Sequence, residues 1–417
     1  MKYKINIFIF FLIIFVVSIF NMVSPKNQTV SAVENRTLAK KPTPSIDSIL
    51  SGNFSMDFEN YFADHFIKRE HLVSTSKYIS SLKGIKRSEE VQLVDFKGQN
   101  AGGNESDTGD ESKKTTSAKE PDTKGNLFIL NDTVMEVYKY NESKCKLYAD
   151  MLNTVSEKMG PNVKIYSLLA PVQIEFLTTK KYKDLSDSQI DSINFINSNL
   201  SKNVTPADAY NPIKEHIDEY VYFSTDHHWT ALGAYYGYTG FAKAAGLSVV
   251  PIEEYKTGEA PGFLGHLSTV NPSEKVNRNP DNVIYYIPSA HSELQVYFYD
   301  KETGTKKSYT GAVINKTYID NDQKYGIFLG GDFPLGVIKT NAKTDKKIMV
   351  IKDSYANAFI PFLLPHYKEI YVIDPRHYKE NIVNLVKENG INEVLVLNYI
   401  LTTNFDTYMN GVLKLMQ

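Results

Sequence analysis

The run Val350-Ile351-Lys352-Asp353-Ser354-Tyr355-Ala356 joins a short apolar stretch to a serine that precedes a predicted helix. An apolar run of this length, bounded by polar residues, is typical of a buried strand. A serine on a tight turn between a strand and a helix exposes its hydroxyl, and its own backbone N–H can face a developing oxyanion. The N-terminus of the following helix adds a favourable potential. The other interpretation is that Asp353 or Ser354 only caps that helix.

Three further apolar runs share this pattern and together predict the fold class. They cover residues 163–171, 369–373 and 393–397, and each is followed by a polar or helical segment. Short buried strands that alternate with helices build βαβ units around a parallel sheet. We therefore expect an α/β domain with a parallel sheet at residues 125–417, with a partly β insertion at about 258–340.

Polar side chains follow each of these predicted strands. In open parallel sheets the ligand crevice lies at the carboxyl ends of the strands. We therefore expect the polar residues of these strand ends to face one site, and they are Gln173, Asp353, Ser354, Asp374, Arg376 and Asn398.

A second run, Ser224-Thr225-Asp226-His227-His228-Trp229-Thr230, contains an acid, two imidazoles and the single tryptophan of the chain. We expect His228 to take the proton of Ser354 and Asp226 to hold the imidazole in the correct tautomer. Two alternatives stay open at this point. In the first, Thr225 or Asp226 only caps the next helix; in the second, the run binds a metal ion through Asp226, His227 and His228. Adjacent histidines do not usually reach one ion easily, so we expect no metal.

Charge and cysteine content exclude some classes of protein. The 46 Lys and Arg residues nearly balance the 48 Asp and Glu residues, which leaves a net charge of -2. Without a basic stripe or a nucleic-acid motif, nucleic acid is not an expected partner. The single cysteine, Cys145, excludes an intrachain disulfide. No cofactor is expected.

The N-terminus predicts that the protein lies outside the cytoplasm. Lys2 and Lys4 precede an uncharged run at residues 5–25. The run is about the ~20 residues that a membrane-spanning helix needs. The positive charge before it predicts that the rest of the chain faces outward. We expect an uncleaved anchor in the cell membrane at residues 1–25, and the alternative is a cleaved signal peptide and a secreted protein.

Two segments separate this predicted anchor from the α/β domain. Residues 26–97 are predicted to form a stalk and a helical region, because apolar residues recur every three or four positions within 46–85. Residues 98–124 are rich in Gly, Ser, Thr and charge. They contain almost nothing to bury, which predicts a disordered linker or a long loop.

The Asp-His-His-Trp run at residues 226–229 and the later Lys-Asp-Ser-Tyr-Ala run at 352–356 resemble the motifs of the DHHW family. That family is related to the alginate O-acetylation proteins (AlgX and AlgJ), whose fold resembles an SGNH hydrolase with the Asp-x-His element moved ahead of the Ser element. Residues 34–38 and 58–66 are also similar to the opening of such proteins. The resemblance implies a three-layer SGNH-like domain, with Ser354 as nucleophile, His228 as base and Asp226 as the orienting acid.

The resemblance also implies where substrate and oxyanion are bound. In SGNH enzymes a Gly and an Asn at later strand ends help to form the oxyanion hole. Here Asp374-Pro375-Arg376 stands where the Gly is expected, and Asn398 stands at the other strand end. Asn398 is therefore expected as a donor, with a turn-forming Asn as the alternative. Arg376 is expected either to bind an anionic sugar or to pair with Asp374, and Gln173 to line the same crevice.

These residues predict a serine O-acetyltransferase that acts on a cell-surface polysaccharide or exopolysaccharide through an acyl-enzyme on Ser354. By resemblance, the acyl group would come from a separate membrane-bound O-acyltransferase. The same triad serves a carbohydrate esterase if water replaces the sugar. A third alternative is a non-catalytic polysaccharide-binding protein that keeps the fold.

Overall fold

The computed structural model describes residues 126–179, 182, 184–270, 274–300 and 302–417, together with residues 21, 30–31, 36–37, 39, 41–50, 53–66, 68 and 91–95. The predicted linker at 98–124 lies outside these residues, and so does the predicted anchor at 1–25 apart from Asn21. Within the described part of the chain, no helix has both the length and the apolar character needed to cross a bilayer.

The chain divides into two units, of which the first comprises residues 1–89 and 278–282. Helices α2 (Ile46–Leu50) and α3 (Asn53–Asp64) lie in this unit, together with the short paired strands β1 (Val30–Ser31) and β2 (Arg36–Thr37). The expected helical region is therefore helical at 46–50 and 53–64, and most of its remainder lies outside the described residues.

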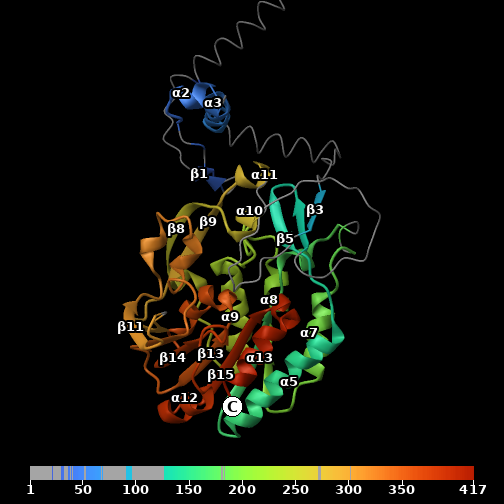
Figure 1. The fold of residues 1–417 in the computed structure, drawn as a ribbon, viewed down its shortest axis with the longest axis vertical. Helices are drawn as coiled ribbons and strands as arrows, with labels where there is room; N and C mark the ends of the chain where they lie inside the picture. Colours follow the sequence, from blue (N-terminus) through green and yellow to red (C-terminus); the bar gives the residue numbers. More distant parts are fainter. Residues whose placement is uncertain are drawn as a thin grey trace, which may run out of the picture. The chain divides into compact units, whose positions relative to one another are not determined.

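The second unit, residues 90–277 and 283–417, contains an eight-stranded sheet in the order β11-β10-β12-β14-β13-β15-β6-β7 (Figure 1). Strands β14, β13, β15, β6 and β7 run parallel. The parallel strands are β6 (Lys164–Ala170), β7 (Val204–Ala207), β13 (Lys347–Lys352), β14 (Glu369–Ile373) and β15 (Glu393–Tyr399). The four strands expected from apolar runs are confirmed, and so is the mixed α/β class with a large central sheet.

Helices cover both faces of this sheet (Figure 1). One layer is formed by α5 (Glu142–Met159), α7 (Gln189–Ser198), α12 (Ile382–Asn389) and α13 (Asp406–Lys414). On the other face, α9 (Ala231–Ala245) packs beside α8 (Tyr210–Glu215) and against β6, where Phe241 contacts Tyr166 edge-on. Residues 348–351 of β13 are completely buried between the two layers.

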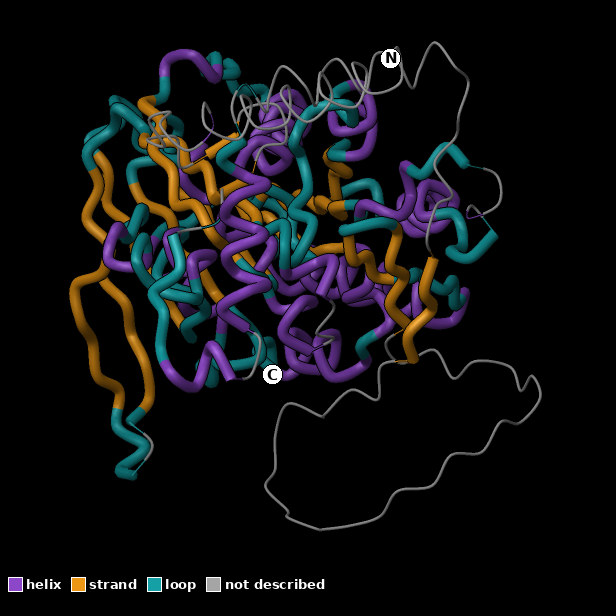
Figure 2. Tube along the Cα trace, turned by 90° about the horizontal axis from the view of Figure 1, so that it is seen from above, coloured by secondary structure: helices purple, strands orange, loops and turns teal. Residues whose placement is uncertain are grey.

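The stretch expected as an insertion at about 258–340 contributes three strands to the central sheet. They are β10 (Ser292–Tyr299), β11 (Lys306–Gly311) and β12 (Leu335–Thr340). Strand β12 runs antiparallel to β14, and β10 runs antiparallel to β12. The β10–β11 hairpin extends from the end of the sheet (Figure 2). Because β10 therefore runs in the same direction as β14, its carboxyl end lies at the same edge of the sheet.

Smaller elements surround this edge. Strand β8 (Lys256–Phe263) pairs with β9 (Asp281–Ile287). Strands β3 (Val91–Asp95), β4 (Asn126–Leu130) and β5 (Thr133–Glu136) form a three-stranded sheet. Val134 N of β5 donates to Ser224 O at 2.9 Å. This bond joins the small sheet to the start of the Ser224–Thr230 loop.

A charged cluster closes the carboxyl end of β13. Lys352 is fully buried, and its Nζ lies 2.5 Å from Asp332 Oδ1 and 3.9 Å from Asp374 Oδ2. Arg376 Nη2 lies 2.7 Å from Asp332 Oδ2. Burial opposes ionisation of Asp332, but Lys352 and Arg376 outweigh it and hold its pKa well below the usual range. The cluster therefore ties the ends of β13 and β14 to the chain before β12.

We predict that Asp332→Asn lowers the free energy of unfolding by about 2 kcal/mol near neutral pH. The variant leaves the buried Lys352 with the carboxylate of Asp374, whose Oδ2 lies 3.9 Å from Nζ. The partial exposure of Asp332 moderates the loss of stability. A carboxylate whose pKa is depressed by folding contributes stability that is complete above its unfolded-state pKa of about 3.9 and is lost as the pH falls toward the folded-state value. The difference between the two proteins should therefore shrink from about pH 6 to about pH 3.

Urea unfolding at both pH values measures this difference. The matched control is Asp345→Asn, which removes a carboxylate that is 98% exposed and pairs with Lys368. Its effect should stay within about 0.5 kcal/mol. An equal loss for Asp332→Asn at both pH values would contradict the prediction.

Candidate active site

Ser354, His228 and Asp226 form one chain of hydrogen bonds. The Nε2 atom of His228 lies 2.8 Å from Ser354 Oγ, and its Nδ1 atom lies 2.5 Å from Asp226 Oδ1. The side chains of His228 and Asp226 are 7% and 4% exposed. A hydroxyl, an imidazole and a carboxylate in this order have the geometry of a nucleophile, its base and the group that orients the base. The structure thus brings together the three residues expected from the sequence.

Backbone N–H groups hold the carboxylate of Asp226 in place. Its Oδ1 accepts from His228 N at 3.0 Å, and its Oδ2 accepts from His266 N at 2.8 Å. Gly265 lies next to this second donor, and a Cβ atom at Gly265 would stand 2.2 Å from Asp226 Cβ. Only a glycine therefore allows the 265–266 backbone to approach the carboxylate so closely.

The charges around Asp226 keep it ionised. Burial by itself raises the pKa of this carboxyl, but the imidazoles of His228 and His227 outweigh burial. The hydrogen bonds from His228 and from His266 N–H act in the same direction, so the pKa of Asp226 lies well below its usual value. A carboxylate that stays charged beside an imidazole is suited to stabilise the imidazolium form of that ring.

The interpretation in which Thr225 or Asp226 caps the next helix is wrong. Thr230 is the N-cap of α9, because its Oγ1 accepts from Gly233 N at 3.2 Å. Thr225 is buried, where its Oγ1 accepts from Gly265 N at 2.9 Å. The loop before α9 therefore leaves the side chain of Asp226 available to His228.

Trp229 fastens the histidine loop to the serine loop. Its indole is completely buried, and Nε1 donates to Tyr355 O at 2.8 Å. In the opposite direction, the Tyr355 hydroxyl donates a short hydrogen bond to His227 O. Two reciprocal hydrogen bonds therefore fix the distance between the loops that carry His228 and Ser354.

The segment after Ser354 differs from the expected helix. It forms two short 3-10 helices, η5 (Ser354–Ala358) and η6 (Ile360–Leu363). Pro361 explains the difference, because its ring clashes with the carbonyl of the residue four positions earlier and prevents a continuous α-helix. The helix predicted after Ser354 is therefore a pair of 3-10 turns, and a single five-residue turn carries little of that potential.

Asp353 caps this turn and anchors it to the neighbouring strand. Its Oδ1 accepts from Tyr355 N at 3.0 Å. Its Oδ2 accepts from Asn398 Nδ2 at 3.0 Å, from Tyr399 N at 3.0 Å and from Thr402 Oγ1 at 2.7 Å. Asp353 thus caps the turn while Ser354 contacts His228, so the two interpretations of this run are compatible.

Tyr325 is a site residue that the sequence did not reveal. Its ring stacks on the imidazole of His228, with centroids 3.8 Å apart and an interplanar angle of 12°. Its hydroxyl donates to Ser354 O at 3.0 Å. Tyr325 therefore contacts both the base and the loop of the nucleophile. It lies in η4 (Lys324–Ile327), in a segment without a recognisable motif.

His227 packs against His228, and Glu136 interacts electrostatically with His227. The His227 ring is 3.9 Å from that of His228, and burial followed by the charge of His228 lowers the pKa of His227. Glu136 ends β5, and its buried Oε2 has no hydrogen-bond partner in the structure. Burial raises the pKa of Glu136, and the charge of His227 opposes that rise.

The three residues considered as metal ligands lie close together. Ligand atoms of Asp226, His227 and His228 lie within 4.8 Å of one another. In the observed arrangement, however, His228 uses Nδ1 for Asp226 and Nε2 for Ser354. A metal ion held by all three residues would therefore have to replace one of the bonds that define the triad.

The remaining expected site residues have different surroundings. Asn398 is fully buried; its Nδ2 donates to Asp353, and its Oδ1 accepts from Tyr148 OH at 2.8 Å. In this position it supports Asp353 rather than facing a substrate. Arg376 pairs with Asp374 and Asp332, although its side chain is 42% exposed. Gln173 is half-buried at the start of η1 (Gln173–Phe176), beyond the carboxyl end of β6.

The family described as DHHW protein matches residues 98–373, which is more than half of the chain. The chain belongs to the DHHW family. A DHHW family protein from Eubacterium siraeum is 29% identical, with a TM-score of 0.61 over 70% of this chain and 95% of that chain. Among curated proteins, none matches significantly.

Two other solved structures resemble this member of the family. PatB1 of Bacillus cereus, in a structure with a sulfonyl adduct, is 21% identical, with a TM-score of 0.57 over 68% of this chain and 97% of that chain. The O-acetyltransferase domain of Pseudomonas putida AlgJ is 12% identical, with a TM-score of 0.41 over 68% of this chain and 96% of that chain. The likeness to PatB1 shows that the fold is shared.

We predict that Gly265→Ala reduces the turnover of a chromogenic acetate ester by about 10²-fold, because the added methyl displaces Asp226 from His228. The rate constant for ester cleavage in the full chain measures the effect. Leu264→Ala is the matched control, since Leu264 is the exposed preceding residue, and it should retain its activity. Unchanged turnover in Gly265→Ala would contradict the prediction.

Proposed function

We propose that this DHHW protein is a serine O-acetyltransferase that esterifies a cell-surface polysaccharide or exopolysaccharide. The observation that carries the proposal is the 2.8 Å approach of His228 Nε2 to Ser354 Oγ, with Asp226 bonded to the other ring nitrogen. These contacts supply an activated nucleophile at the carboxyl edge of a largely parallel sheet, where α/β proteins bind their ligands.

The first half-reaction loads the serine. His228 Nε2 accepts the proton of Ser354 as Oγ attacks the carbonyl carbon of the acyl donor. Collapse of the tetrahedral intermediate breaks the bond to the leaving group, and His228 gives that group the proton. The products are an ester on Ser354 and the deacylated, protonated donor. Asp226 keeps Nδ1 protonated and stabilises the imidazolium throughout.

The second half-reaction delivers the acyl group. His228 takes the proton of a sugar hydroxyl, and the sugar oxygen attacks the ester carbonyl on Ser354. Collapse of this second intermediate releases the acylated sugar, and the serine oxygen recovers its proton from His228. Water in place of the sugar would give an esterase with the same residues, so the acceptor decides between the two activities.

Residues outside the triad act as positioning groups in this proposal. Tyr325 packs on the face of the base and binds the carbonyl of Ser354. Asn398, expected from the sequence as an oxyanion donor, holds Asp353 under the turn instead. Arg376 is committed to two carboxylates, which makes the ion pair its proposed role.

We also propose an extracytoplasmic place of action for this enzyme. The proposal rests on Lys2, Lys4 and the uncharged run at residues 5–25, which would anchor the chain with its catalytic unit facing outward. A membrane-bound O-acyltransferase on the same membrane would then supply the acyl group, as the resemblance to the alginate O-acetylation proteins suggests. The partner would need to present an activated acyl group at the outer surface.

The full chain in mild detergent, incubated with a chromogenic acetate ester and acceptor oligosaccharides, tests the proposal. We expect acetylated oligosaccharide, detected by mass spectrometry, in addition to the released chromophore. Free acetate without acetylated sugar would identify an esterase. If the ester is not cleaved and a sulfonyl fluoride does not label Ser354, the protein is not an enzyme of this class.

We predict that Ser354→Ala removes acyl transfer to the level of the uncatalysed reaction, because the attacking oxygen is lost. His228→Ala should be nearly as severe, since members of a triad act as a unit. The measurement is the initial rate of ester cleavage. Ser308→Ala, which alters an exposed serine on β11, is the matched control and should leave the rate unchanged.

A further inference from the structure

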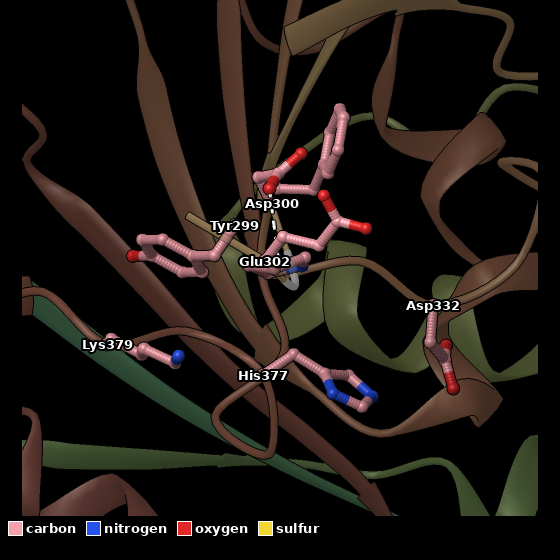
Figure 3. Close-up of a pocket in the computed structure, with 8 residues that line it drawn as sticks. Tyr299, Asp300, Glu302, Asp332, His377 and Lys379 are labelled. Atoms are coloured by element: carbon pink, nitrogen blue, oxygen red, sulfur yellow. Dashed lines mark hydrogen bonds between the residues drawn. The ribbon is translucent and has the colours of Figure 1, made fainter. Parts of the chain in front are cut away.

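A pocket of about 700 Å³ lies at the carboxyl edge of the central sheet, beyond the triad. Its volume falls in the range of roughly 300–1,000 Å³ that is typical of small-molecule sites. The β10–β11 hairpin forms one wall, and the segments after β14 and before β12 form the others (Figure 3). The residues labelled there are Tyr299, Asp300, Glu302, Asp332, His377 and Lys379.

The sheet order places this pocket beside the catalytic serine. Ser354 follows β13, and the strands β14, β12 and β10 come next in the sheet. Neighbouring strands lie about 4.8 Å apart, so the end of β10 is roughly 14 Å from the end of β13. A short oligosaccharide spans that distance. A polymer bound in the pocket could therefore present a hydroxyl near Ser354.

Asp332 links the pocket wall directly to the serine loop. Its Oδ1 accepts from Asn357 Nδ2 at 3.0 Å and from Lys352 Nζ at 2.5 Å. Lys352 and Asn357 stand two residues before and three residues after Ser354. The wall and the nucleophile are thus parts of one hydrogen-bonded assembly, which fixes the pocket relative to the reacting atom.

The charges of the lining are partly compensated, because Asp332 pairs with Lys352 and Arg376. Three of the six labelled side chains are carboxylates, and one, Lys379, is a lysine. The Nζ atom of Lys379 lies 5.0 Å from the centroid of the Tyr299 ring. Asp300 pairs with Lys307, and this bond is the main reason that its pKa is lowered to about 2. Glu302 is exposed, and its carboxylate extends toward the open space of the pocket (Figure 3). Glu302 forms no ion pair within the described part of the chain, so its carboxylate disfavours a carboxylate or phosphate group of a ligand at this point of the pocket.

The same side chains suit the groups that an uncharged or amino sugar offers. Carboxylates accept hydrogen bonds from hydroxyl and ammonium groups. The ring of His377, and the face of the Tyr299 ring opposite Lys379, are amphipathic surfaces on which the C–H face of a sugar ring can lie. A few polar groups around an aromatic surface are typical of a site that fixes the orientation of a small ligand.

We infer that this pocket binds the acceptor glycan, and that the acceptor is a neutral or amino-bearing sugar chain rather than an anionic polymer. The inference rests on the proposed transfer to a polysaccharide and adds the chemical class of that polysaccharide. Tyr299 and Glu302 carry the binding. Asp332 positions the bound chain relative to Ser354.

Binding to the full-length Ser354→Ala protein, measured by titration calorimetry, tests the inference. The probes are pentamers of glucosamine, of N-acetylglucosamine and of galacturonate, which are cationic, neutral and anionic. We expect the first two to bind at least about tenfold more tightly than the third at physiological ionic strength. Failure of the first two to bind, or a preference for galacturonate, would overturn the inference.

Variants of the hairpin locate the binding site. Tyr299→Ala and Glu302→Gln should each weaken binding of the preferred pentamer by about tenfold, the loss of roughly one good contact. Tyr309→Ala and Glu293→Gln are the matched controls, because both residues are exposed on the same hairpin and neither lines the pocket. Equal effects of the test and control variants would show that the glycan binds elsewhere and would overturn the inference.

Kinetics with intact Ser354 separate this inference from the proposed function. Tyr299→Ala should raise the KM for the acceptor about tenfold, whereas Tyr309→Ala should leave that KM unchanged. If the ester is cleaved but no variant changes the acceptor KM, the pocket assignment fails and the proposed chemistry stands. If Ser354 is unreactive, the proposed chemistry fails, and calorimetry still decides whether the pocket binds glycan.

Discussion

The hydrogen bond between His228 and Ser354 depends on holding together two loops that are 126 residues apart in the chain. The loops are not joined covalently, and burial of Trp229 and Tyr355 provides the connection. Each of these aromatic side chains donates to a backbone carbonyl of the opposite loop. A buried donor without its acceptor would cost about 1–3 kcal/mol. The polar atoms of the two rings therefore enforce one relative position of the loops.

Much of the fold could be predicted because parallel strands buried on both faces are continuous apolar runs. Strands β13 and β15 are of this kind. Strands β10 and β12 were harder to place, because nothing in their sequences marks β12 as the partner of β14 or β10 as the partner of β12. The 3-10 turns after Ser354 have a cause that is visible in the sequence, because Pro361 interrupts an α-helix there.

The triad could be predicted from its motifs, but the groups that support it could not. The triad is contacted by residues from segments whose sequences contain no recognisable motif, namely Tyr325, Gly265 and His266. Their roles arise from tertiary packing, and in the case of His266 the functional group is a backbone N–H. Polar residues at strand ends also divide into different roles, since Asn398 supports a capping residue while Asp332 binds a buried lysine.

The two outer strands of the central sheet differ sharply in sequence from the inner ones. At one end, β11 begins with Lys306 and Lys307, and its side chains are mostly exposed. At the other end, β7 contains Pro206, which has no N–H to donate. Lysines and prolines on edge strands discourage the addition of a foreign strand. Copies of this protein at high concentration are thereby protected from joining their sheets into aggregates.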